Sequence, residues 1–329
     1  MPKITVLVPV FNEESNLPEL HAELTRIAAS RTVVSDGDVQ ADVDLSGYKW
    51  EFLFVNDGSH DGSFEMLMKM RQEDPRVNVV NFARNFGKEI AMMAGLDFAS
   101  GDAVVIVDAD LQDPVELIPE MVYWWRRGYD DVYGLRTKRG QESWLRKTLS
   151  LSFYRMLQST SREDVLQNVG DFRLLSRRAV DALTRLRETK RYTKGLFCWI
   201  GFNKKAIPFE RCDRRQGKSS FNFLRLFNLA IEGFTSYTTS PLRLASILGI
   251  SVSIMSMLYL VFVLIKYFIH GEDVQGYPTL VCLILFLGGV QLLALGIIGE
   301  YIGRIFNETK GRPPYIVESF NGATPLRNN

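Results

Sequence analysis

Residues Gly101–Pro114 read GDAVVIVDADLQDP, and this stretch is the strongest indication of the fold. The aliphatic run Val104–Val107 leads directly into Asp108-Ala109-Asp110. An uninterrupted apolar run bounded by polar residues is typical of a strand buried on both faces of a parallel sheet. Ligands of open α/β sheets bind just beyond the carboxyl ends of such strands, so we expect Asp108 and Asp110 at a binding site.

The two carboxylates also suggest what binds there. Asp108 and Asp110 share one side of the chain if the strand geometry continues, and such a pair suits a hard divalent cation that carries substrate phosphates. The alternative is a strand followed by a helix, with Asp113 as the N-cap and Pro114 at the first helical position. That alternative leaves Asp108 and Asp110 unexplained, so we predict a metal–nucleotide site.

Length, charge and cysteine content limit the class of protein. The 329 residues allow one large domain and a second region, and the net charge of +1 argues against a nucleic-acid-binding protein. Cys198, Cys212 and Cys282 show neither metal-ligand spacing nor an even count, which fits a reducing compartment without a disulfide framework. The apolar run Ile4–Val10 is interrupted at Pro9 and has no cleavage site, so it does not predict a signal peptide.

Two long segments near the C-terminus contain no charged residue. They are the 22 residues Leu244–Ile265 and the 24 residues Gly276–Gly299. Each is long enough to cross a hydrocarbon core of about 30 Å as a helix, and neither shows a polar face. We therefore predict a transmembrane hairpin within residues 241–303, with helices at about 242–268 and 277–303.

The charges around these segments predict their orientation. Arg243 precedes the first segment, and Arg304, Lys310 and Arg312 follow the second, whereas the connecting turn carries Glu272. Lysine and arginine concentrate on the cytoplasmic side of membrane proteins. The N-terminal domain and the tail 304–329 should both be cytoplasmic.

The first 210 residues alternate between strand and helix patterns, which predicts right-handed βαβ units and a mostly parallel sheet. We expect strands at Ile4–Val10, Glu51–Val55, Val77–Phe82 and Val104–Val107, and helices at Glu13–Ala28, Asp61–Gln72 and Lys88–Ala99. The acidic segment Ser35–Leu45 lacks the glycine and the terminal glutamate of a calcium loop, so it is interpreted as a solvated, mobile insertion. Neither a Gly-x-Gly-x-x-Gly motif nor a Walker loop is present, which argues against a dehydrogenase and a phosphate-loop ATPase.

Several motifs resemble those of a known family. Val8–Glu14, Asn56–Ser59 and Asp108–Pro114 are similar to motifs of glycosyltransferase family 2, which has the Rossmann-like, mostly parallel GT-A fold. Four further segments resemble the polyprenyl-phosphate branch of this family, and within it the bactoprenol glucosyltransferases of O-antigen glucosylation. They are Arg84–Glu89, Val169–Leu174, Gly299–Arg304 and Arg312–Tyr315. The resemblance implies a catalytic domain at 1–219, a juxtamembrane amphipathic helix at 220–240, and then the hairpin and the tail.

The resemblance also assigns the donor site. It implies that uridine and ribose are held by Pro9, Phe11, Glu13 and Asp57, with Arg84 and Lys88 nearby. Asp108 would contact the nucleotide, while Asp110 and Gln112 would bind Mg²⁺ or Mn²⁺ at the diphosphate. The alternatives stay open: Glu13 and Asp57 as cap or turn residues, and Arg84 and Lys88 as part of a solvated face.

On the acceptor side, Asp171 would be a base or a positioning carboxylate, or else an aspartate that closes a turn. An acceptor phosphate is largely dianionic at neutral pH, which favours the positioning role. The loop around Arg214 resembles the family's Arg-x-x-Gly-x-Ser element, with Ser220 where a lysine is usual. It implies that Arg214, Arg215, Lys218 and Ser219 bind phosphate; ordinary juxtamembrane cations are the alternative.

Two further segments combine basic residues and aromatics at helical spacing, Ser143–Ser159 and Phe221–Tyr237. Basic amphipathic helices suit the membrane interface, although packing against the sheet is equally compatible with either segment. Together they would hold the catalytic face against membrane lipid.

We therefore expect an inverting, metal-dependent glycosyltransferase of the bacterial inner membrane, multi-pass, with its catalytic domain in the cytoplasm. It would transfer a hexose, with glucose favoured, from a UDP-sugar to undecaprenyl phosphate. UDP-N-acetylglucosamine or a UDP-aminopentose is the alternative donor. A processive synthase is disfavoured because no Gln-x-x-Arg-Trp element is present, and a non-catalytic scaffold or flippase subunit would not need Asp108 and Asp110. A homo-oligomer stays open.

Overall fold

The computed structural model describes residues 1–36, 39–137, 169–188, 193–209 and 276–323, together with scattered positions between 249 and 269. The chain divides into two compact units. The first comprises residues 1–158, 163–220 and 313–329, and the second comprises 159–162 and 221–312. Residues 313–329 of the C-terminal tail thus belong to the N-terminal unit.

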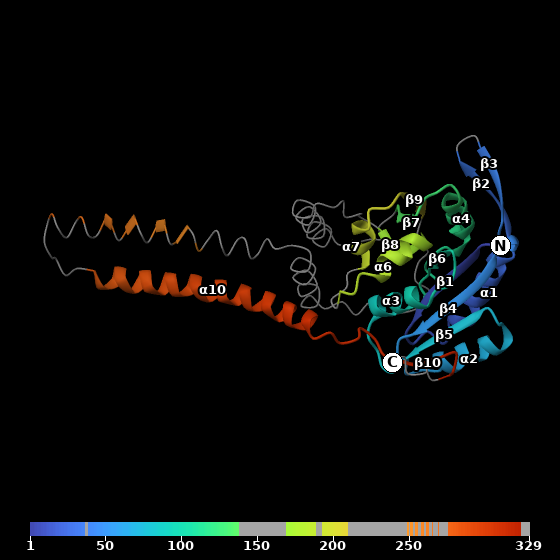
Figure 1. The fold of residues 1–329 in the computed structure, drawn as a ribbon, viewed down its shortest axis with the longest axis horizontal. Helices are drawn as coiled ribbons and strands as arrows, with labels where there is room; N and C mark the ends of the chain where they lie inside the picture. The colour runs from blue at the N-terminus through green and yellow to red at the C-terminus, as the bar shows by residue number, and fades with distance from the viewer. Residues whose placement is uncertain are drawn as a thin grey trace. The chain divides into compact units, whose positions relative to one another are not determined.

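The first unit is built on an eight-stranded sheet with the order β10-β5-β4-β1-β6-β8-β7-β9 (Figure 1). Its strands are β1 (Lys3–Val10), β4 (Lys49–Asn56), β5 (Val77–Phe82), β6 (Ala103–Ile106), β7 (Asp131–Arg136), β8 (Val169–Ser176), β9 (Lys204–Phe209) and β10 (Val317–Phe320). The pairs of β1 with β4 and β6, of β4 with β5, and of β7 with β9 are parallel. β8 and β10 pair antiparallel with their neighbours. The predicted mostly parallel sheet is confirmed.

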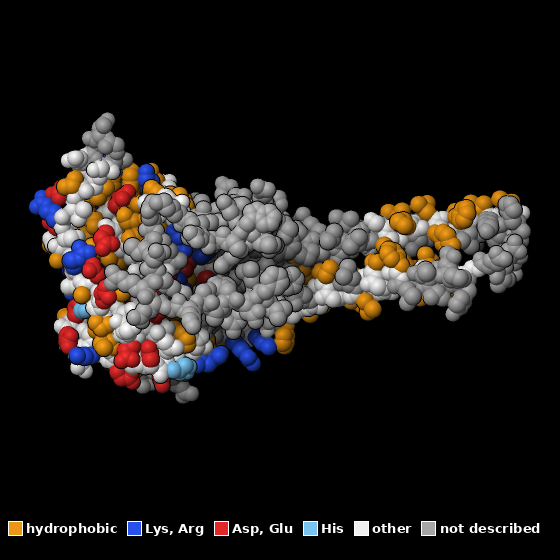
Figure 2. Space-filling view, turned by 180° about the vertical axis from the view of Figure 1, so that it is seen from behind, with side chains coloured by type: hydrophobic (Ala, Val, Ile, Leu, Met, Phe, Trp, Pro, Cys, Tyr) orange, Lys and Arg blue, Asp and Glu red, His pale blue; other side chains and the backbone are white. Residues whose placement is uncertain are grey.

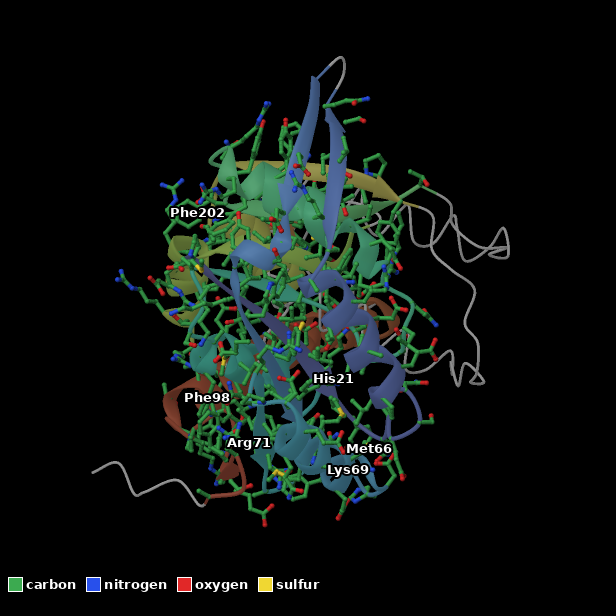
Figure 3. The ribbon with its side chains drawn as sticks, turned by 90° about the vertical axis from the view of Figure 1, so that its right-hand side faces the viewer. His21, Met66, Lys69, Arg71, Phe98 and Phe202 are labelled. Atoms are coloured by element: carbon green, nitrogen blue, oxygen red, sulfur yellow. The ribbon has the colours of Figure 1, made fainter. Side chains whose placement is uncertain are left out.

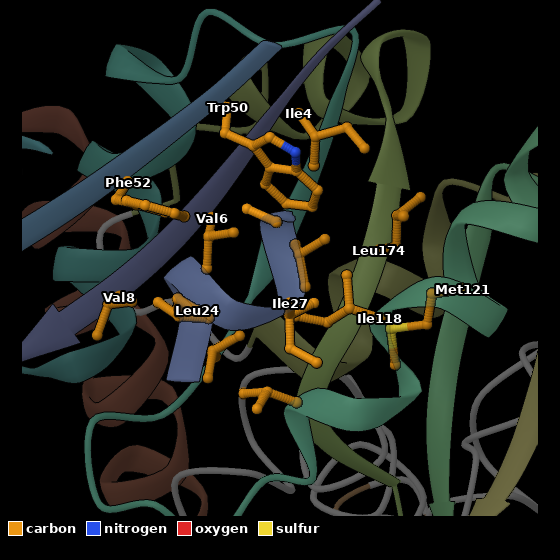
Figure 4. Close-up of a cluster of buried hydrophobic side chains, with 14 of the residues drawn as sticks. Ile4, Val6, Val8, Leu24, Ile27, Trp50, Phe52, Ile118, Met121 and Leu174 are labelled. Atoms are coloured by element: carbon orange, nitrogen blue, oxygen red, sulfur yellow. The ribbon is translucent and has the colours of Figure 1, made fainter. Parts of the chain in front are cut away.

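Helices cover both faces of this sheet, each with its own apolar core. The helices are α1 (Leu17–Ala28), α2 (Ser63–Glu73), α3 (Lys88–Phe98), α4 (Ile118–Arg126), α6 (Arg177–Thr184) and α7 (Thr193–Trp199). Ile4, Val6 and Val8 of β1 point to the face of α1, α2 and α4 (Figure 4), whereas Leu7 points to the face of α3, α6 and α7. This alternation follows from the two-residue period of a strand and explains why the strands are apolar throughout.

The four predicted strands lie where they were expected, within one or two residues at each end. The first two helices begin later than expected, at Leu17 and Ser63. The alternative interpretation of Asp113 as a helix N-cap does not hold. A 3-10 turn, η2 (Val115–Leu117), follows Pro114, which itself occupies the N-cap, and α4 begins only at Ile118. The Asp113 carboxylate instead accepts a hydrogen bond from the Asp108 backbone N–H at 3.0 Å.

The acidic segment 35–45 was interpreted as a solvated, mobile insertion, but most of its described residues belong to regular strands. β2 (Arg31–Asp36) and β3 (Val39–Asp44) form an antiparallel hairpin that extends beyond the sheet (Figure 3), followed by the 3-10 turn η1 (Leu45–Gly47). Val34 and Val43 are buried, while Asp42 and Asp44 face solvent. The hairpin therefore has one apolar face and one charged face.

In the second unit, helix α10 spans Tyr277–Thr309. Its portion Phe286–Thr309 has a mean hydropathy of 1.5 and is the one helix of the described residues that is long and apolar enough to cross a membrane. Large apolar side chains lie on the surface of this unit (Figure 2). Leu292 and Phe306 are two of the exposed residues. The predicted turn at Glu272 and most of the first predicted membrane helix lie outside the described residues.

Candidate active site

A cavity of about 360 Å³ lies at the carboxyl ends of β1, β4 and β6 and at the start of α3. Its lining comprises Pro9, Val10, Phe11, Glu13, Asp57, Asn85, Gly87, Lys88, Ala91, Asp108, Ala109 and Asp110. The parallel register brings these segments together, because β1 pairs along its length with β4 and β6. Seven predicted site residues share this cavity: Pro9, Phe11, Glu13, Asp57, Lys88, Asp108 and Asp110.

The turn after β1 is held by the loop after β4. Asn12 has a left-handed backbone (φ 56°), and its N–H donates to Ser59 Oγ at 3.0 Å. Its Oδ1 accepts from the His60 N–H at 2.8 Å, and the Phe11 ring meets the His60 ring edge-on. Phe11 is 42% exposed. These contacts present the side chains of Phe11 and Glu13 to the cavity.

Asp57 fixes the segment that follows β5. Its two carboxylate oxygens accept from the backbone N–H groups of Phe86 at 2.6 Å and Gly87 at 2.9 Å. Burial raises the pKa of Asp57, although the two N–H donors act in the opposite direction. Gly58 (φ 64°) is required next to it, because a Cβ there would lie 2.5 Å from backbone atoms of Arg84 and Asn85.

One cation joins two carboxylates that are distant in sequence. Lys88 Nζ lies 2.6 Å from Asp108 Oδ1 and 2.7 Å from Asp171 Oδ2. Burial would lower the pKa of Lys88, but the two carboxylates outweigh it and hold that pKa above its usual value. Burial would likewise raise the pKa of Asp171, yet the positive charge of Lys88 holds it below the usual range. Asp171 is therefore ionised at neutral pH and is a weak base.

The strand that carries Asp171 is anchored by a buried ion pair. Arg173 Nη1 lies 3.0 Å from Asp131 Oδ2, and both side chains are almost fully buried. The Arg173 guanidinium also lies 3.6 Å from the centroid of the Phe197 ring. Asp171 lies inside strand β8 and not in a turn, so the alternative of a turn-closing aspartate is excluded.

The loop after β6 combines strain with buried polar groups. Leu111 has a left-handed backbone (φ 58°), and Asp110 Oδ1 accepts from the Gln112 N–H at 3.2 Å. Gln112 is buried, and its Nε2 has no hydrogen-bond partner among the described residues. Burial and the adjacent Asp108 carboxylate raise the pKa of Asp113 to about 7. Asp110 and the Gln112 amide are hard oxygen donors, a set that fits a divalent cation.

The remaining predicted residues fall elsewhere. The Arg84 guanidinium lies over the Phe86 ring, 4.4 Å from its centroid, and is not part of the cavity lining. Arg214, Arg215, Lys218 and Ser219 lie outside the described residues, as do the amphipathic segments 143–159 and 221–237. Asn85 was not predicted as a site residue; its position between the predicted Arg84 and Lys88, three residues after the end of β5, was the available signal.

Two family profiles match the chain. The profile of glycosyl transferase family 2 matches residues 5–184, and that of the GtrB C-terminal hairpin matches residues 240–305. An uncharacterized glycosyltransferase of Synechocystis is 40% identical over 97% of this chain and 96% of its own length. The bactoprenol glucosyl transferase derived from the SfII prophage of Shigella flexneri is 40% identical over 98% of this chain and its full length.

Solved structures also show similarity. A mannosyltransferase from Pyrobaculum calidifontis, in complex with GDP-mannose and Mn²⁺, aligns with a TM-score of 0.42 and 16% identity over 89% of this chain and 87% of its own. Glucosyl-3-phosphoglycerate synthase from Mycobacterium tuberculosis, in complex with Mn²⁺, UDP-glucose and phosphoglyceric acid, aligns with a TM-score of 0.42 and 19% identity, covering 70% of this chain and 76% of its own.

Proposed function

The chain belongs to glycosyl transferase family 2 and is an enzyme of GT-A type with a mostly parallel sheet, and from that premise we propose its reaction. It transfers a hexose, with glucose favoured, from a UDP-sugar to undecaprenyl phosphate and inverts the anomeric centre. A phosphate oxygen of the acceptor forms the new bond to the sugar while UDP leaves. The observation that carries this proposal is the convergence of Asp57, Lys88, Asp108 and Asp110 at one cavity, where Lys88 also contacts Asp171.

The donor occupies the cavity at the ends of β1 and β4. Phe11, Glu13 and Asp57 contact uridine and ribose, and Asp108 lies toward the diphosphate. Asp57 is already fixed by two backbone N–H donors, so it is held in place before the donor arrives. The Arg84 guanidinium lies over the Phe86 ring, so Arg84 contacts the donor only if its side chain moves away from that ring.

Asp110 and Gln112 would hold Mg²⁺ or Mn²⁺. When bound, such a cation stabilises the charge that develops on the departing diphosphate by several kcal/mol. Asp108 has a different role, because its carboxylate is already paired with Lys88. The hydrogen bond from the Gln112 N–H to Asp110 Oδ1 spans the left-handed Leu111 and ties Asp110 to Gln112.

The acceptor phosphate binds beside Asp171. Because the pKa of Asp171 is lowered and the phosphate is already nucleophilic, this carboxylate positions the acceptor site and is not required to remove a proton. The Lys88 ammonium group beside it offers a positive charge to the incoming phosphate. Arg214, Arg215, Lys218 and Ser219 complete the phosphate site.

The acceptor is a lipid, so the protein must reach a membrane. We propose a cytoplasmic catalytic domain at 1–219, an interfacial helix at 220–240, two membrane helices within 241–303 and a cytoplasmic tail at 304–329. The exposed apolar surface of α10 and the matching hairpin profile support this division. The reaction then occurs at the cytoplasmic leaflet of the bacterial inner membrane.

A donor panel tests the proposed function. Membranes that contain the protein are incubated with undecaprenyl phosphate and labelled UDP-glucose, UDP-N-acetylglucosamine or a UDP-aminopentose, and the lipid product is identified by mass spectrometry. We expect undecaprenyl phosphoglucose. A different lipid-linked sugar would correct the donor, and no lipid-linked product with any of the three donors would overturn the proposal.

A further inference from the structure

The last strand of the sheet is linked to the donor cavity by a continuous series of side-chain hydrogen bonds. Strand β10 pairs antiparallel with β5 at the edge of the sheet (Figure 1). The pairing shifts between Val317 and Ser319, so Glu318 is the extra residue of a β-bulge. Bulges re-aim side chains, and here the Glu318 carboxylate points to Asn81.

Four hydrogen bonds form this series, and all run in one direction. Asn12 N–H donates to Ser59 Oγ at 3.0 Å, and the Ser59 hydroxyl donates to Asn56 Oδ1 at 2.5 Å. Asn56 Nδ2 then donates to Asn81 Oδ1 at 2.7 Å, and Asn81 Nδ2 donates to Glu318 Oε2 at 2.9 Å. Asn56 and Asn81 are buried, so bulk water does not compete for their amides.

The direction is decided by Glu318. An asparagine amide can present either its oxygen or its nitrogen to a neighbour, but a carboxylate only accepts. Glu318 therefore requires Nδ2 of Asn81 to face it, which leaves Oδ1 of Asn81 for Asn56 and Oδ1 of Asn56 for the Ser59 hydroxyl. A hydroxyl that donates is a better acceptor, so the series strengthens the bond that holds Asn12.

We propose that Glu318 is a positioning residue for the donor site and acts through Asn81, Asn56 and Ser59 on the turn at Asn12. That turn carries Phe11 and Glu13, which line the cavity. Strand β10 of the C-terminal tail thus helps to position residues of the nucleotide site, although Glu318 itself does not line the cavity. The consequence for UDP rests on the proposed function, whereas the hydrogen-bond series does not.

Substitutions that reverse and then restore the direction give a sharp test. Glu318→Lys offers only donors, so both amides must turn over. Asn56 would then present its NH₂ group to Ser59, where the present 2.5 Å separation suits O–H···O but is too short for N–H···O. In the double variant Glu318→Lys/Asn81→Asp, the new carboxylate accepts from the new ammonium group and from Asn56 Nδ2, which restores the original direction. Glu318→Gln keeps an acceptor and should behave like the parent.

Two readouts are measured in the full-length protein: deuterium exchange at the Asn12 amide, and the Kd of UDP by calorimetry. In Glu318→Lys we expect the exchange rate of the Asn12 amide and the Kd of UDP each to increase about 3- to 10-fold. Ser59→Ala removes the hydroxyl that binds Asn12 and shows the largest change that loss of this hydrogen bond can cause. The double variant should return both values to near those of the parent. In membranes, donor KM should rise in Glu318→Lys with kcat nearly unchanged.

Asn321→Gly is the matched control. Asn321 Oδ1 accepts from the Val79 N–H at 2.8 Å, and its Nδ2 donates to Asn78 Oδ1 at 3.0 Å, so this variant loosens the same tail without touching the series. Its positive φ of 54° suits glycine. Exchange at Asn12 should stay at the parental rate in this variant.

The outcomes separate the two proposals. Parental exchange at Asn12 in Glu318→Lys, or failure of the double variant to restore it, would overturn the positioning role. Faster exchange with an unchanged Kd for UDP would also overturn it, because the turn would then not govern donor binding. If exchange at Asn12 changes in the variants as expected but the parent protein does not bind UDP, the proposed donor is overturned and the positioning role is not.

Discussion

At the scale of single residues, the distribution of charge around Lys88 determines what the site can accept. One ammonium group neutralises only one of the two carboxylates that it contacts, Asp108 and Asp171. Asp110 adds a further carboxylate to the lining of the same cavity. A diphosphate would be repelled from such a site unless a cation accompanied it, which is the physical reason to expect a metal with the donor.

The metal role predicts the effect of Asp110→Ala. We expect kcat/KM to fall by about 100-fold or more, because a ligand of the charge-stabilising cation is lost. Excess chelator should inactivate the parent enzyme to the same degree. Asp181→Ala is the control, since that carboxylate is 57% exposed on α6, and it should retain parental activity. Full turnover in chelator would contradict the metal role.

The Lys88–Asp171 contact predicts a change in pH dependence. If the ionised carboxylate is needed, kcat falls as the pH drops through the pKa of Asp171. Lys88 keeps that pKa low, so Lys88→Met should move the acid limb of the kcat profile at saturating donor to higher pH. Lys194→Met removes a cation with a smaller effect on the same carboxylate and should shift the limb less. Identical acid limbs in all three proteins would refute this role.

The residues at strand ends were predictable, and the contacts between them were not. Asp57, Asp108 and Asp110 each lie within three residues of the end of an apolar run, and the parallel sheet brings such positions to one edge. The contact of Lys88 with Asp171 joins residues 83 positions apart. This contact depends on the antiparallel pairing of β8 with β6. A pattern of alternating strands and helices predicts parallel pairing and so does not predict this neighbour.

At the scale of elements, the hairpin β2–β3 shows how an acidic segment can be ordered. Its aspartates suggested a solvated insertion. In the structure, however, Val34 pairs with Ala41, Val43 pairs with Thr32, and the two valines are buried. Alternation of apolar and polar positions was the signal that the charge count obscured. The sequence Gly37-Asp38, which separates the paired residues Asp36 and Val39, is typical of a two-residue hairpin turn and was a second signal.

Adjacent valines in β2 provide a direct test of this hairpin. Val34 is 6% exposed and Val33 is 58% exposed. Val34→Ala should lower the free energy of unfolding by about 1–2 kcal/mol, because two buried methyl groups are lost, whereas Val33→Ala should have little effect. Denaturant unfolding of the purified protein measures both. Equal effects of the two substitutions would mean that the apolar face of the hairpin is not packed as described.

At the scale of the whole molecule, the tail restricts how the chain can meet a membrane. β9 ends at Phe209 and β10 begins at Val317, and both strands belong to one sheet. The chain must therefore leave and return to the same side, so any membrane crossings between them are even in number. If α10 crosses once, a second crossing lies before it, which agrees with the uncharged segment Leu244–Ile265.

This constraint predicts the result of cysteine labelling in intact cells. In a background without native cysteines, Glu272→Cys should react with a membrane-impermeant reagent from the periplasm, whereas Ala323→Cys, next to β10, should react only after permeabilisation. The excess of lysine and arginine after Gly299 supports this orientation, and a cytoplasmic active site has access to UDP-sugars. Protection of both positions would mean that the hairpin does not cross. Labelling of Ala323→Cys alone would reverse the orientation and would separate the active site from its donor.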